Sequence, residues 1–181
     1  MRQSGEYRIG ATVDAVWRAL NDPGVLSQCI DGCQSMTRTA DGAFAATVKA
    51  KIGPLSAVFT AEVTLGDLDP PTGYTLRVAV KGGAAGFANG AAKVSLTPED
   101  DATLLRYEVD GHVGGKLAQV GQRLIDAGAR KMADDFFAKF GEIVAPVAGE
   151  ATAARRAAWL WPVIAMLAGT IAALFAVRRK R

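Results

Sequence analysis

Between residues 33 and 113, apolar and polar residues alternate along most of the chain. A period of two is typical of half-buried β-strands, whose side chains point to opposite faces in turn. Breaks rich in Gly, Pro and Asp interrupt the alternation at 41–42, 53–54, 69–73 and 98–101, and such residues mark turns. The pattern therefore predicts about six strands, joined by hairpins into an antiparallel sheet.

Helical spacing replaces the alternation on either side of this region. A first strand ends at Ile9, and Thr12 is a predicted N-cap for a short helix with apolar residues at i, i+3, i+4 and i+7. A second short helix is predicted over 25–29. A single helix of about 30 residues is predicted over 116–144, because apolar residues recur there at helical spacing.

One strand, two short helices, a meander of strands and one long helix predict an α+β fold. The arrangement is of the helix-grip type, in which a curved antiparallel sheet wraps around a long C-terminal helix. This domain is predicted to span residues 1–146, a length sufficient for a substantial core. Residues 147–158 are predicted to form a linker.

The inward faces of the predicted elements are apolar, but many of their positions hold Ala or Gly. In the sheet these faces comprise Phe44, Ala46, Val48, Ala50 and Ile52; Leu55, Ala57, Phe59, Ala61, Val63 and Leu65; Tyr74, Leu76, Val78 and Val80; Ala88, Gly90, Ala92, Val94 and Leu96; and Leu105, Tyr107, Val109 and Gly111. In the long helix the inward face comprises Leu117, Val120, Gly121, Leu124, Gly128, Met132, Phe136, Phe140 and Ile143. A helix held over a sheet by such small residues either lies very close to the sheet or leaves a hollow, and the pattern is consistent with both. Because an empty apolar hollow costs about 24 cal/mol per Å³, a hollow of ligand size implies an apolar ligand.

The side-chain chemistry of the domain argues against an enzyme. On the inward faces only Tyr74 and Tyr107 can titrate, and His112, the one histidine, shares strand parity with an outward polar row. A single His and two Cys offer no metal site with credible spacing. Cys29 and Cys33 are separated by three residues, which is not the two-residue spacing of a redox motif. We therefore predict no catalytic residue and no metal.

An uncharged segment follows the linker. Residues 157–177 contain no charged side chain, and their helical length of about 31 Å matches the hydrocarbon core of a bilayer. We predict a transmembrane helix over 159–177 and a basic tail over 178–181; a buried terminal helix and a helix lying in the membrane surface are the alternatives. The residues predicted to contact lipid are Trp159, Trp161, Ile164, Leu167, Ile171, Leu174 and Phe175. Since no signal-peptide pattern precedes the domain, we expect it at the cytoplasmic membrane, on the cytoplasmic side.

Charge is distributed unevenly between these parts. Residues 1–146 carry 15 Lys and Arg against 17 Asp and Glu, whereas residues 147–181 carry six basic residues and one acidic residue. The basicity behind the pI of about 9.0 therefore lies in the C-terminal segment. No basic stripe with interleaved aromatic residues appears in the domain. The distribution argues against a nucleic-acid partner and favours a membrane.

Seven segments together resemble the CoxG family of carbon monoxide dehydrogenase subunits, within the START-like (SRPBCC) superfamily of helix-grip proteins. They are Gly5-Glu6-Tyr7-Arg8-Ile9, Val16-Trp17-Arg18-Ala19-Leu20-Asn21-Asp22-Pro23, Cys29-Ile30-Asp31-Gly32-Cys33, Val48-Lys49-Ala50-Lys51-Ile52-Gly53-Pro54, Leu68-Asp69-Pro70-Pro71, Gly83-Ala84-Ala85-Gly86-Phe87-Ala88 and Gly114-Gly115-Lys116-Leu117-Ala118-Gln119. The resemblance covers residues 1 to about 145. Asp31 departs from the family motif, which more often has Pro at this position, so the turn is expected to be less stiff.

The resemblance implies an accessory protein and not a catalytic subunit. Similar proteins recruit a molybdenum-containing carbon monoxide dehydrogenase, or a related molybdenum hydroxylase, to the cytoplasmic membrane, where its electrons reach the quinone pool. We therefore expect no covalent cofactor and a cavity for an isoprenoid quinone or a lipid. The predicted lining is Phe44, Phe59, Ala61, Leu76, Val78, Ala92, Tyr107, Leu117, Gly121 and Leu124, with the Tyr107 hydroxyl as hydrogen-bond donor to a quinone oxygen.

Two other functions are consistent with the same residues. The protein could be a structural docking or assembly factor that binds no ligand. It could also be a START-like enzyme acting on a hydrophobic substrate, which requires a titratable side chain inside the cavity.

Overall fold

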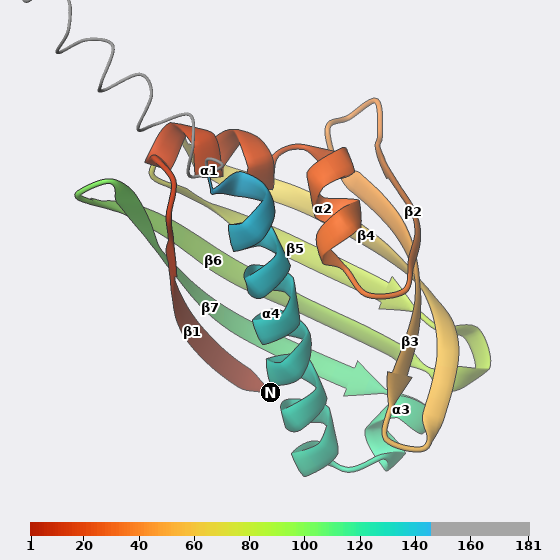
Figure 1. Cartoon of the computed structure of the whole chain (residues 1–181). Helices are drawn as coiled ribbons and strands as arrows, with labels where there is room; N and C mark the ends of the chain where they lie inside the picture. The colour runs from red at the N-terminus through yellow and green to blue at the C-terminus, as the bar shows by residue number, and fades with distance from the viewer. Residues whose placement is uncertain (146–181) are drawn as a thin grey trace, which may run out of the picture. The chain divides into compact units, whose positions relative to one another are not determined.

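The computed structural model describes residues 1–145 and contains one antiparallel sheet of seven strands, in the order β1-β7-β6-β5-β4-β3-β2 (Figure 1). The strands are β1 Arg2–Ile9, β2 Cys33–Arg38, β3 Phe44–Ile52, β4 Leu55–Asp69, β5 Gly73–Lys81, β6 Phe87–Glu99 and β7 Ala102–Gly114. Strands β2 to β7 form a meander, and β1 pairs with β7, the last strand. This arrangement confirms the predicted single strand followed by an antiparallel meander.

The helices follow the predicted order. They are α1 Val13–Leu20, α2 Pro23–Cys29, the 3₁₀ turn η1 Gly83–Ala85, α3 Lys116–Gln119 and α4 Gln122–Val144. The N-cap of α1 is Thr12, whose hydroxyl accepts a hydrogen bond from the Ala15 amide at 3.4 Å. Asp22 caps α2 in the same way, accepting from the Gly24 amide at 2.7 Å. Local capping chemistry therefore defines where both short helices begin.

The prediction of a single helix over 116–144 is wrong in one respect, because the structure has two helices there, α3 and α4. Gly121 lies at the break with φ 98°, a conformation that residues with a Cβ rarely adopt. The inward face of α4 also differs from the prediction. Leu124 and Met132 are 48% and 47% exposed, whereas Ile125 is buried. Steps of four residues drift by about 40° each around a helix of 3.6 residues per turn, so the predicted ladder rotates away from the sheet.

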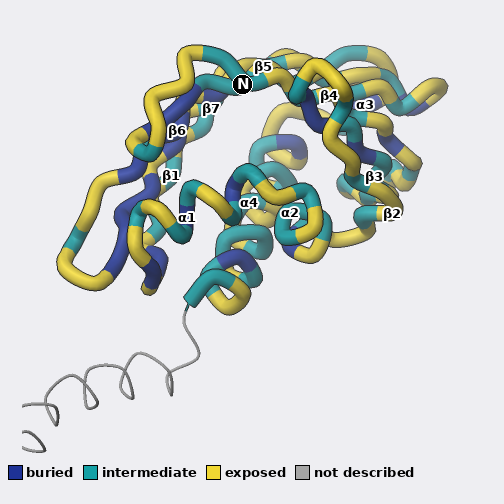
Figure 2. The backbone as a smooth tube through the Cα atoms, turned by 90° about the horizontal axis from the view of Figure 1, so that it is seen from above, coloured by how far each residue is buried: buried dark blue, intermediate teal, exposed yellow. Residues whose placement is uncertain are grey.

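The long helix α4 crosses the concave side of the sheet, and α1 and α2 lie near its C-terminal half (Figures 1 and 2). It packs on α1 and α2, and on β1 and β3 near the two margins of the sheet. This is the helix-grip arrangement. Residues 1–145 form one compact unit.

The alternation of buried and exposed residues confirms the predicted strand faces. In β7, Leu105 and Tyr107 are 0% and 9% exposed, whereas Arg106, Glu108 and His112 point outward. In β6 the predicted inward set runs from Ala88 to Leu96 at every second position, and it lies on the concave face. Faces were predictable because strand side chains have a strict period of two.

The main core lies where α1 and the C-terminal half of α4 meet β1, β6 and β7. Its most buried side chains include Ile9, Val16, Leu105 and Phe140, all between 0% and 2% exposed. Strands β3 to β5 contribute less, since on their concave face Val63, Leu65 and Leu76 are only half-buried. The sheet is therefore well covered on one side of α4 and partly uncovered on the other.

The predicted transmembrane helix requires a correction. No helix within residues 1–145 is both long enough and apolar enough to cross a bilayer. The segment 159–177, with its predicted lipid contacts from Trp159 to Phe175, lies outside the described residues, as do the linker and the basic tail. The fold class is therefore limited to the α+β helix-grip domain, and the predicted localisation at the cytoplasmic membrane is withdrawn.

Candidate functional site

An apolar cavity of about 210 Å³ lies between the concave face of the sheet and the helices α2 and α4. It is lined by Leu20, Leu26, Ile30, Met36, Phe44, Val63, Leu65, Tyr74, Leu76, Val94, Leu105, Phe136 and Phe137. Helix α1 contributes one of these side chains, α2 and the residue after it contribute two, α4 contributes two, and the sheet supplies the others. The cavity is therefore formed by several elements together and not by one, and it is partly open to solvent.

Tyr74 is the lining residue whose side chain carries a hydrogen-bonding oxygen or nitrogen. Its side chain is only 7% exposed, and its hydroxyl makes no hydrogen bond to any of residues 1–145. No fully buried side-chain oxygen or nitrogen in these residues lacks a partner, so the Tyr74 hydroxyl keeps some contact with solvent. Burial raises the pKa of the Tyr74 phenol to about 12, because the charged phenolate is poorly solvated there. Tyr74 is therefore a neutral donor, with an unused proton, in an otherwise apolar wall.

The position of Tyr74 is set by its neighbours in the sheet and by α1. Gly73 lies so close to β6 that a Cβ atom built there would approach the Val94 carbonyl oxygen to 2.6 Å. This close approach holds the start of β5 against β6, where Tyr74 pairs with Val94. The edge of the Trp17 ring packs against the Tyr74 ring, with centroids 5.5 Å apart. The phenol is thus held in one orientation before any ligand enters.

The volume of the cavity limits what it can hold. A dry apolar cavity of about 150 Å³ is large enough for benzene, whereas drug-sized ligands occupy about 300 to 1,000 Å³. At about 210 Å³, this cavity has room for one substituted ring or for a short branched hydrocarbon such as a prenyl unit. A whole isoprenoid chain exceeds the enclosed space.

An exposed ion pair joins the two helical walls of the cavity. Lys139 of α4 donates a hydrogen bond to Asp31, in the turn that follows α2 and directly after the lining residue Ile30. The Lys139 hydrogen bond lowers the pKa of the Asp31 carboxyl, and the same bond raises the pKa of the Lys139 amine. The pair therefore ties the α2 wall to the α4 wall at the surface.

A stack of aromatic rings fills the space on the other side of α4. The ring centroids of Tyr7 and Phe137 are 4.2 Å apart, and those of Tyr107 and Phe137 are 5.9 Å apart. The Tyr7 hydroxyl donates a hydrogen bond to Asp134 at 2.6 Å, and burial together with this bond raises the pKa of the Tyr7 phenol. The Tyr107 ring packs directly on Gly5, where a Cβ atom would come within 2.5 Å of it. Tyr107 is therefore held between Phe137 of α4 and Gly5 of β1.

Only two of the ten residues predicted to line the cavity do so, Phe44 and Leu76. Five others lie on the same concave face or in the core beyond the cavity wall: Phe59, Ala61, Val78, Ala92 and Leu117. Tyr107 belongs to the aromatic stack. Gly121 lies at the break between α3 and α4, and Leu124 is 48% exposed. Whether any of the ten contacts a ligand stays a prediction.

Sequence reasoning missed the contribution of α2. Leu26 and Ile30 are four residues apart, which places both on one face of a short helix, and both line the cavity. That spacing is visible in the sequence, and it could have predicted that α2 covers the sheet. Tyr74 was predicted to point inward, but its position near α1 and α2 depends on contacts between residues that are distant in the sequence.

Within residues 1–145, no group of three His, Cys, Asp or Glu side chains is arranged to hold a metal ion. Cys29 is buried and Cys33 is half-buried, and both are free thiols. Burial raises the pKa of the Cys29 thiol, which lowers its reactivity.

A larger hollow, of about 580 Å³, lies on the outer face of the sheet across β1, β7, β6 and β5. Its walls carry charges of both signs, including Arg2, Lys93, Glu108 and Asp110. Arg2 and Asp110 form an ion pair at 3.2 Å, with side chains 88% and 68% exposed. Such solvated charges offer little to an apolar ligand, so the smaller inner cavity is the better candidate site.

Comparison with solved structures supports the fold. A conserved protein from Geobacillus kaustophilus is 34% identical, with a TM-score of 0.75, and the match covers 80% of this chain and 95% of that one. A START superfamily protein from Mycobacterium smegmatis is 16% identical, with a TM-score of 0.58, covering 79% of this chain and 96% of that one. A protein from Chromobacterium violaceum is 13% identical, with a TM-score of 0.60, covering 81% and 99%. The last two are similar in fold alone.

Comparison at the level of sequence identifies a family. No curated protein matches the chain. The model of the CoxG family, which describes a subunit of carbon monoxide dehydrogenase, matches residues 5–145, nearly all of the domain that contains the cavity. This chain therefore belongs to the CoxG family of carbon monoxide dehydrogenase subunits.

Proposed function

We propose that this protein is an accessory protein of a carbon monoxide dehydrogenase that holds an isoprenoid quinone or a lipid in the cavity beneath α2 and α4. Membership of the CoxG family and the START-like fold support an accessory protein associated with that enzyme. The ligand would couple the oxidation of carbon monoxide to the respiratory chain. The observation that best supports a bound ligand is the apolar cavity, in which the Tyr74 hydroxyl has no hydrogen-bond partner among residues 1–145.

The apolar walls of the pocket favour occupation. The pocket is partly open to solvent, so these walls are in contact with water when it is empty. The lining offers aliphatic and aromatic carbon almost everywhere, so the driving force is the removal of apolar surface from water. A quinone ring or a prenyl unit meets this requirement of size and polarity.

Tyr74 supplies the specificity in this proposal. A quinone carbonyl is an acceptor without a donor, and the neutral Tyr74 hydroxyl is a donor without a partner among residues 1–145. A ligand with an acceptor at this position gains a hydrogen bond from Tyr74 that a pure hydrocarbon cannot accept, so it is preferred over a hydrocarbon. In this proposal Tyr74, and not Tyr107, donates the hydrogen bond to the quinone oxygen.

Extraction of the purified protein with organic solvent, followed by mass spectrometry, tests for a resident ligand. Calorimetric titration of the extracted protein with a benzoquinone that carries one prenyl unit then measures affinity. Absence of any isoprenoid or lipid in the extract, together with no heat of binding, would contradict the proposal.

A matched pair of substitutions in β4 shows where such a ligand binds. Val63→Phe places a larger side chain in the cavity wall, whereas Val58→Phe makes the same change at a position that is 48% exposed. We expect Val63→Phe to weaken quinone binding at least about tenfold and Val58→Phe to leave it unchanged. If Val63→Phe binds no quinone but still supports electron transfer from the enzyme, the protein is a docking factor without a ligand.

A further inference from the structure

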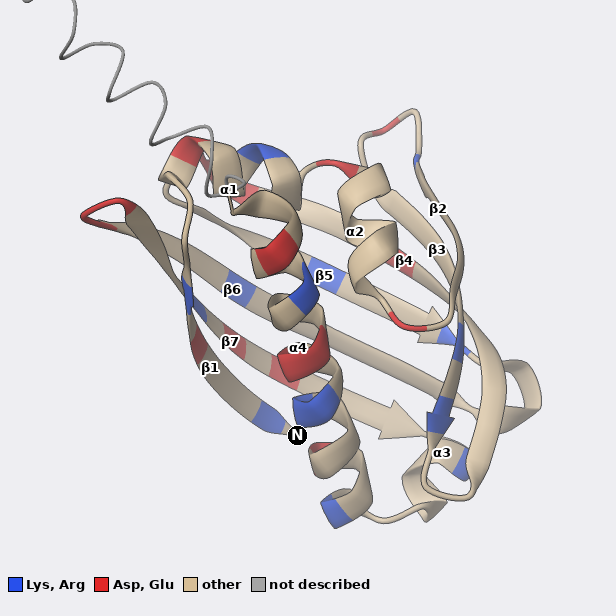
Figure 3. Ribbon diagram, in the orientation of Figure 1, with Lys and Arg blue, Asp and Glu red and all other residues tan. Residues whose placement is uncertain are grey.

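The turns at the two ends of the strands differ in charge, although the domain carries nearly equal numbers of acidic and basic residues. The turns β2–β3, β4–β5 and β6–β7 lie at one end of the sheet and carry Asp41, Asp69, Glu99, Asp100 and Asp101 (Figure 3). Because adjacent strands are antiparallel, the turns β3–β4 and β5–β6 and the connection from β7 to α3 lie at the opposite end. These three connections contain no Asp or Glu.

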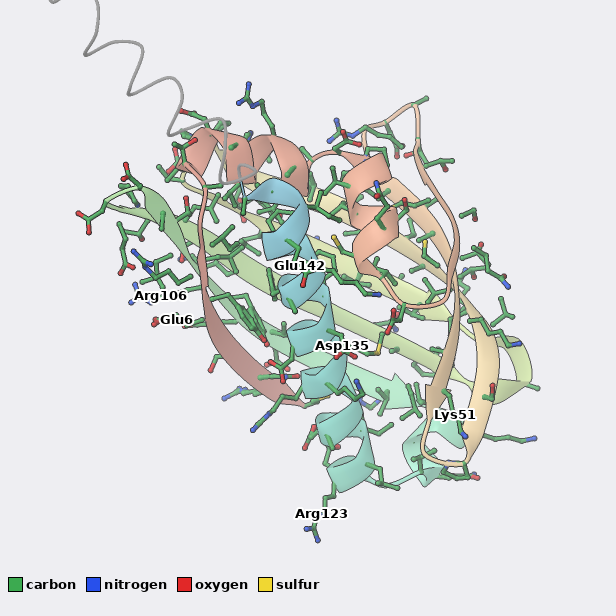
Figure 4. All side chains as sticks on the ribbon, viewed as in Figure 1. Glu6, Lys51, Arg106, Arg123, Asp135 and Glu142 are labelled. Carbon is green, nitrogen blue, oxygen red and sulfur yellow. The ribbon has the colours of Figure 1, made fainter. Side chains whose placement is uncertain are left out.

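The second end, which we call the basic end, carries cations without partners. Its basic residues are Lys49, Lys51, Lys81, Lys116 and Arg123. All are exposed, and none forms an ion pair within residues 1–145. Figure 4 shows Lys51 near the end of β3 and Arg123 at the start of α4. Elsewhere in the domain several cations are paired, as Arg106 is with Glu6 at 2.6 Å.

Close backbone packing joins the segments of the basic end into one surface. At Gly115, a Cβ atom would lie 2.7 Å from the Gly86 Cα atom, so the β5–β6 connection touches the start of α3. Gly53, in the β3–β4 turn, lies against Val120 and Leu124, with side-chain atoms 3.4 Å from where its Cβ atom would be. Three sequence segments far apart in the chain therefore form one continuous end of the domain.

Exposed apolar side chains lie among these cations. Phe87, Leu124 and Val58 are 41%, 48% and 48% exposed, and they come from β6, α4 and β4. The Phe87 ring packs on Gly114, where a Cβ atom would approach it to 2.3 Å, while the rest of the ring stays open to solvent. Aromatic and aliphatic contacts surrounded by charge are typical of protein interfaces.

Three of the segments that resemble the CoxG family meet at this end. They are the segments 48–54, 83–88 and 114–119. None of them contributes a residue to the lining of the cavity. The basic end is thus built from sequence that the proposed ligand site does not use.

We propose that the basic end is the surface by which this protein docks on an acidic face of its carbon monoxide dehydrogenase. This inference rests on the accessory role proposed above. Unpaired cations attract an acidic surface and orient the encounter, and Phe87, Leu124 and Val58 supply the apolar contact. The partner is assigned as a protein and not as an anionic lipid surface because the CoxG family model describes a subunit of carbon monoxide dehydrogenase, and exposed apolar side chains beside cations are typical of protein interfaces.

Charge reversal in the full chain tests this docking surface. The variant Lys51→Glu with Lys116→Glu changes two cations of the basic end. Its control, Arg77→Glu with Lys93→Glu, makes the same change of net charge at two exposed positions in the middle of the outer face, which also form no ion pair within residues 1–145. Affinity for the cognate carbon monoxide dehydrogenase is measured by surface plasmon resonance at low and at high salt.

We expect the basic-end variant to lose at least about tenfold in affinity at low salt and the control variant to change by less than about twofold. The affinity of the unmodified protein should fall as salt rises. Both variants should retain the ligand found by solvent extraction, which separates loss of docking from loss of the cavity. Lys81→Glu with Arg123→Glu repeats the test if the first variant does not fold.

Other outcomes overturn the proposal. Equal losses for the two variants would mean that only net charge matters. A basic-end variant that binds the enzyme normally but loses affinity for vesicles of phosphatidylglycerol would assign this end to lipid. A change confined to the oligomeric state would assign it to contact between copies of the chain. An unmodified protein that does not bind the enzyme at all would remove the accessory role itself, whatever the cavity binds.

Discussion

The two flanks of α4 are packed in opposite ways. On the flank that faces β1 and β7, the rings of Tyr7, Tyr107 and Phe137 fill the space between helix and sheet. On the flank that faces α2, an apolar cavity of about 210 Å³ remains that is partly open to solvent, and Phe137 also forms part of its wall. The same helix is therefore packed by aromatic rings on one flank and left partly uncovered on the other.

The largest effect is expected from a loss of packing on the filled flank. Phe140 is 0% exposed, and its ring centroid lies 5.8 Å from that of Phe136 and 6.4 Å from that of Phe137. We expect Phe140→Ala to lower the free energy of unfolding by about 3 to 5 kcal/mol. Met132→Ala, on the same helix at 47% exposed, should change it by less than about 0.5 kcal/mol. Urea denaturation measures both, and similar values for the two variants would contradict the comparison.

A smaller effect is expected when a methyl group is added to the filled flank. At Gly5 a Cβ atom would come within 2.5 Å of the Tyr107 ring, so the stack must shift to accept it. We expect Gly5→Ala to destabilise the protein by about 1 to 3 kcal/mol, as overpacking does. Gly10→Ala is the matched control, because no atom lies within 4 Å of its added Cβ. Thermal unfolding of the two variants distinguishes a filled flank from one with spare room, and a stable Gly5→Ala would argue for spare room.

The smallest effect on stability is expected at the hollow flank. The Tyr74 hydroxyl has no hydrogen-bond partner among residues 1–145, so Tyr74→Phe should change the free energy of unfolding by less than about 0.5 kcal/mol at neutral pH. The same variant should weaken quinone binding about two- to tenfold, which calorimetry measures. A strongly destabilised Tyr74→Phe would show that the hydroxyl has a structural partner.

The pH dependence of stability sharpens this last prediction. The folded chain keeps the Tyr74 proton until its pKa of about 12, whereas the unfolded chain releases it near the ordinary value of 10.0. Between these values the unfolded state binds fewer protons, so the contribution of Tyr74 to stability falls as pH rises. Urea denaturation across this range should show a smaller decline for Tyr74→Phe than for the unmodified protein. Equal declines would place the phenol in a solvated environment.

Much of the fold was predictable, because its signals are local. The strand faces follow from alternation, and the beginning of α1 follows from Thr12 as its cap. Helix α2 begins at Pro23, two residues before the predicted start, because Asp22 caps it. The break at Gly121 was not predicted, since glycine within an apolar helical pattern also fits a continuous helix. The face of α4 was predicted with the wrong phase, which made Leu124 an inward residue although it is 48% exposed. Met132 and Ile143, also predicted to face inward, are 47% and 41% exposed.

The candidate site was predictable in kind but not in detail. The recurrence of Ala and Gly on inward faces indicated either close packing or a hollow, but the residues that line the cavity include no Ala or Gly, so these small residues do not form it. Phe44 and Leu76 were predicted and line the cavity, whereas Leu26, Ile30 and Tyr74 line it without having been predicted to do so. Leu26 and Ile30 line it because α2 lies over the sheet, and Tyr74 because of its place beside β6 and α1.

The sequence by itself determined which side of each strand faces inward and which family the chain resembles, because both depend on short stretches of neighbouring residues. Only the tertiary structure decided which inward residues surround a hollow. The difference between the two tyrosines is that Tyr74 lines the cavity and Tyr107 does not. The tertiary structure also decided that the cations of the basic end form one surface. The physical reason is the same in each case. Which residues surround a space or lie side by side depends on contacts between elements far apart in sequence, and the residue pattern within one element does not reveal those contacts.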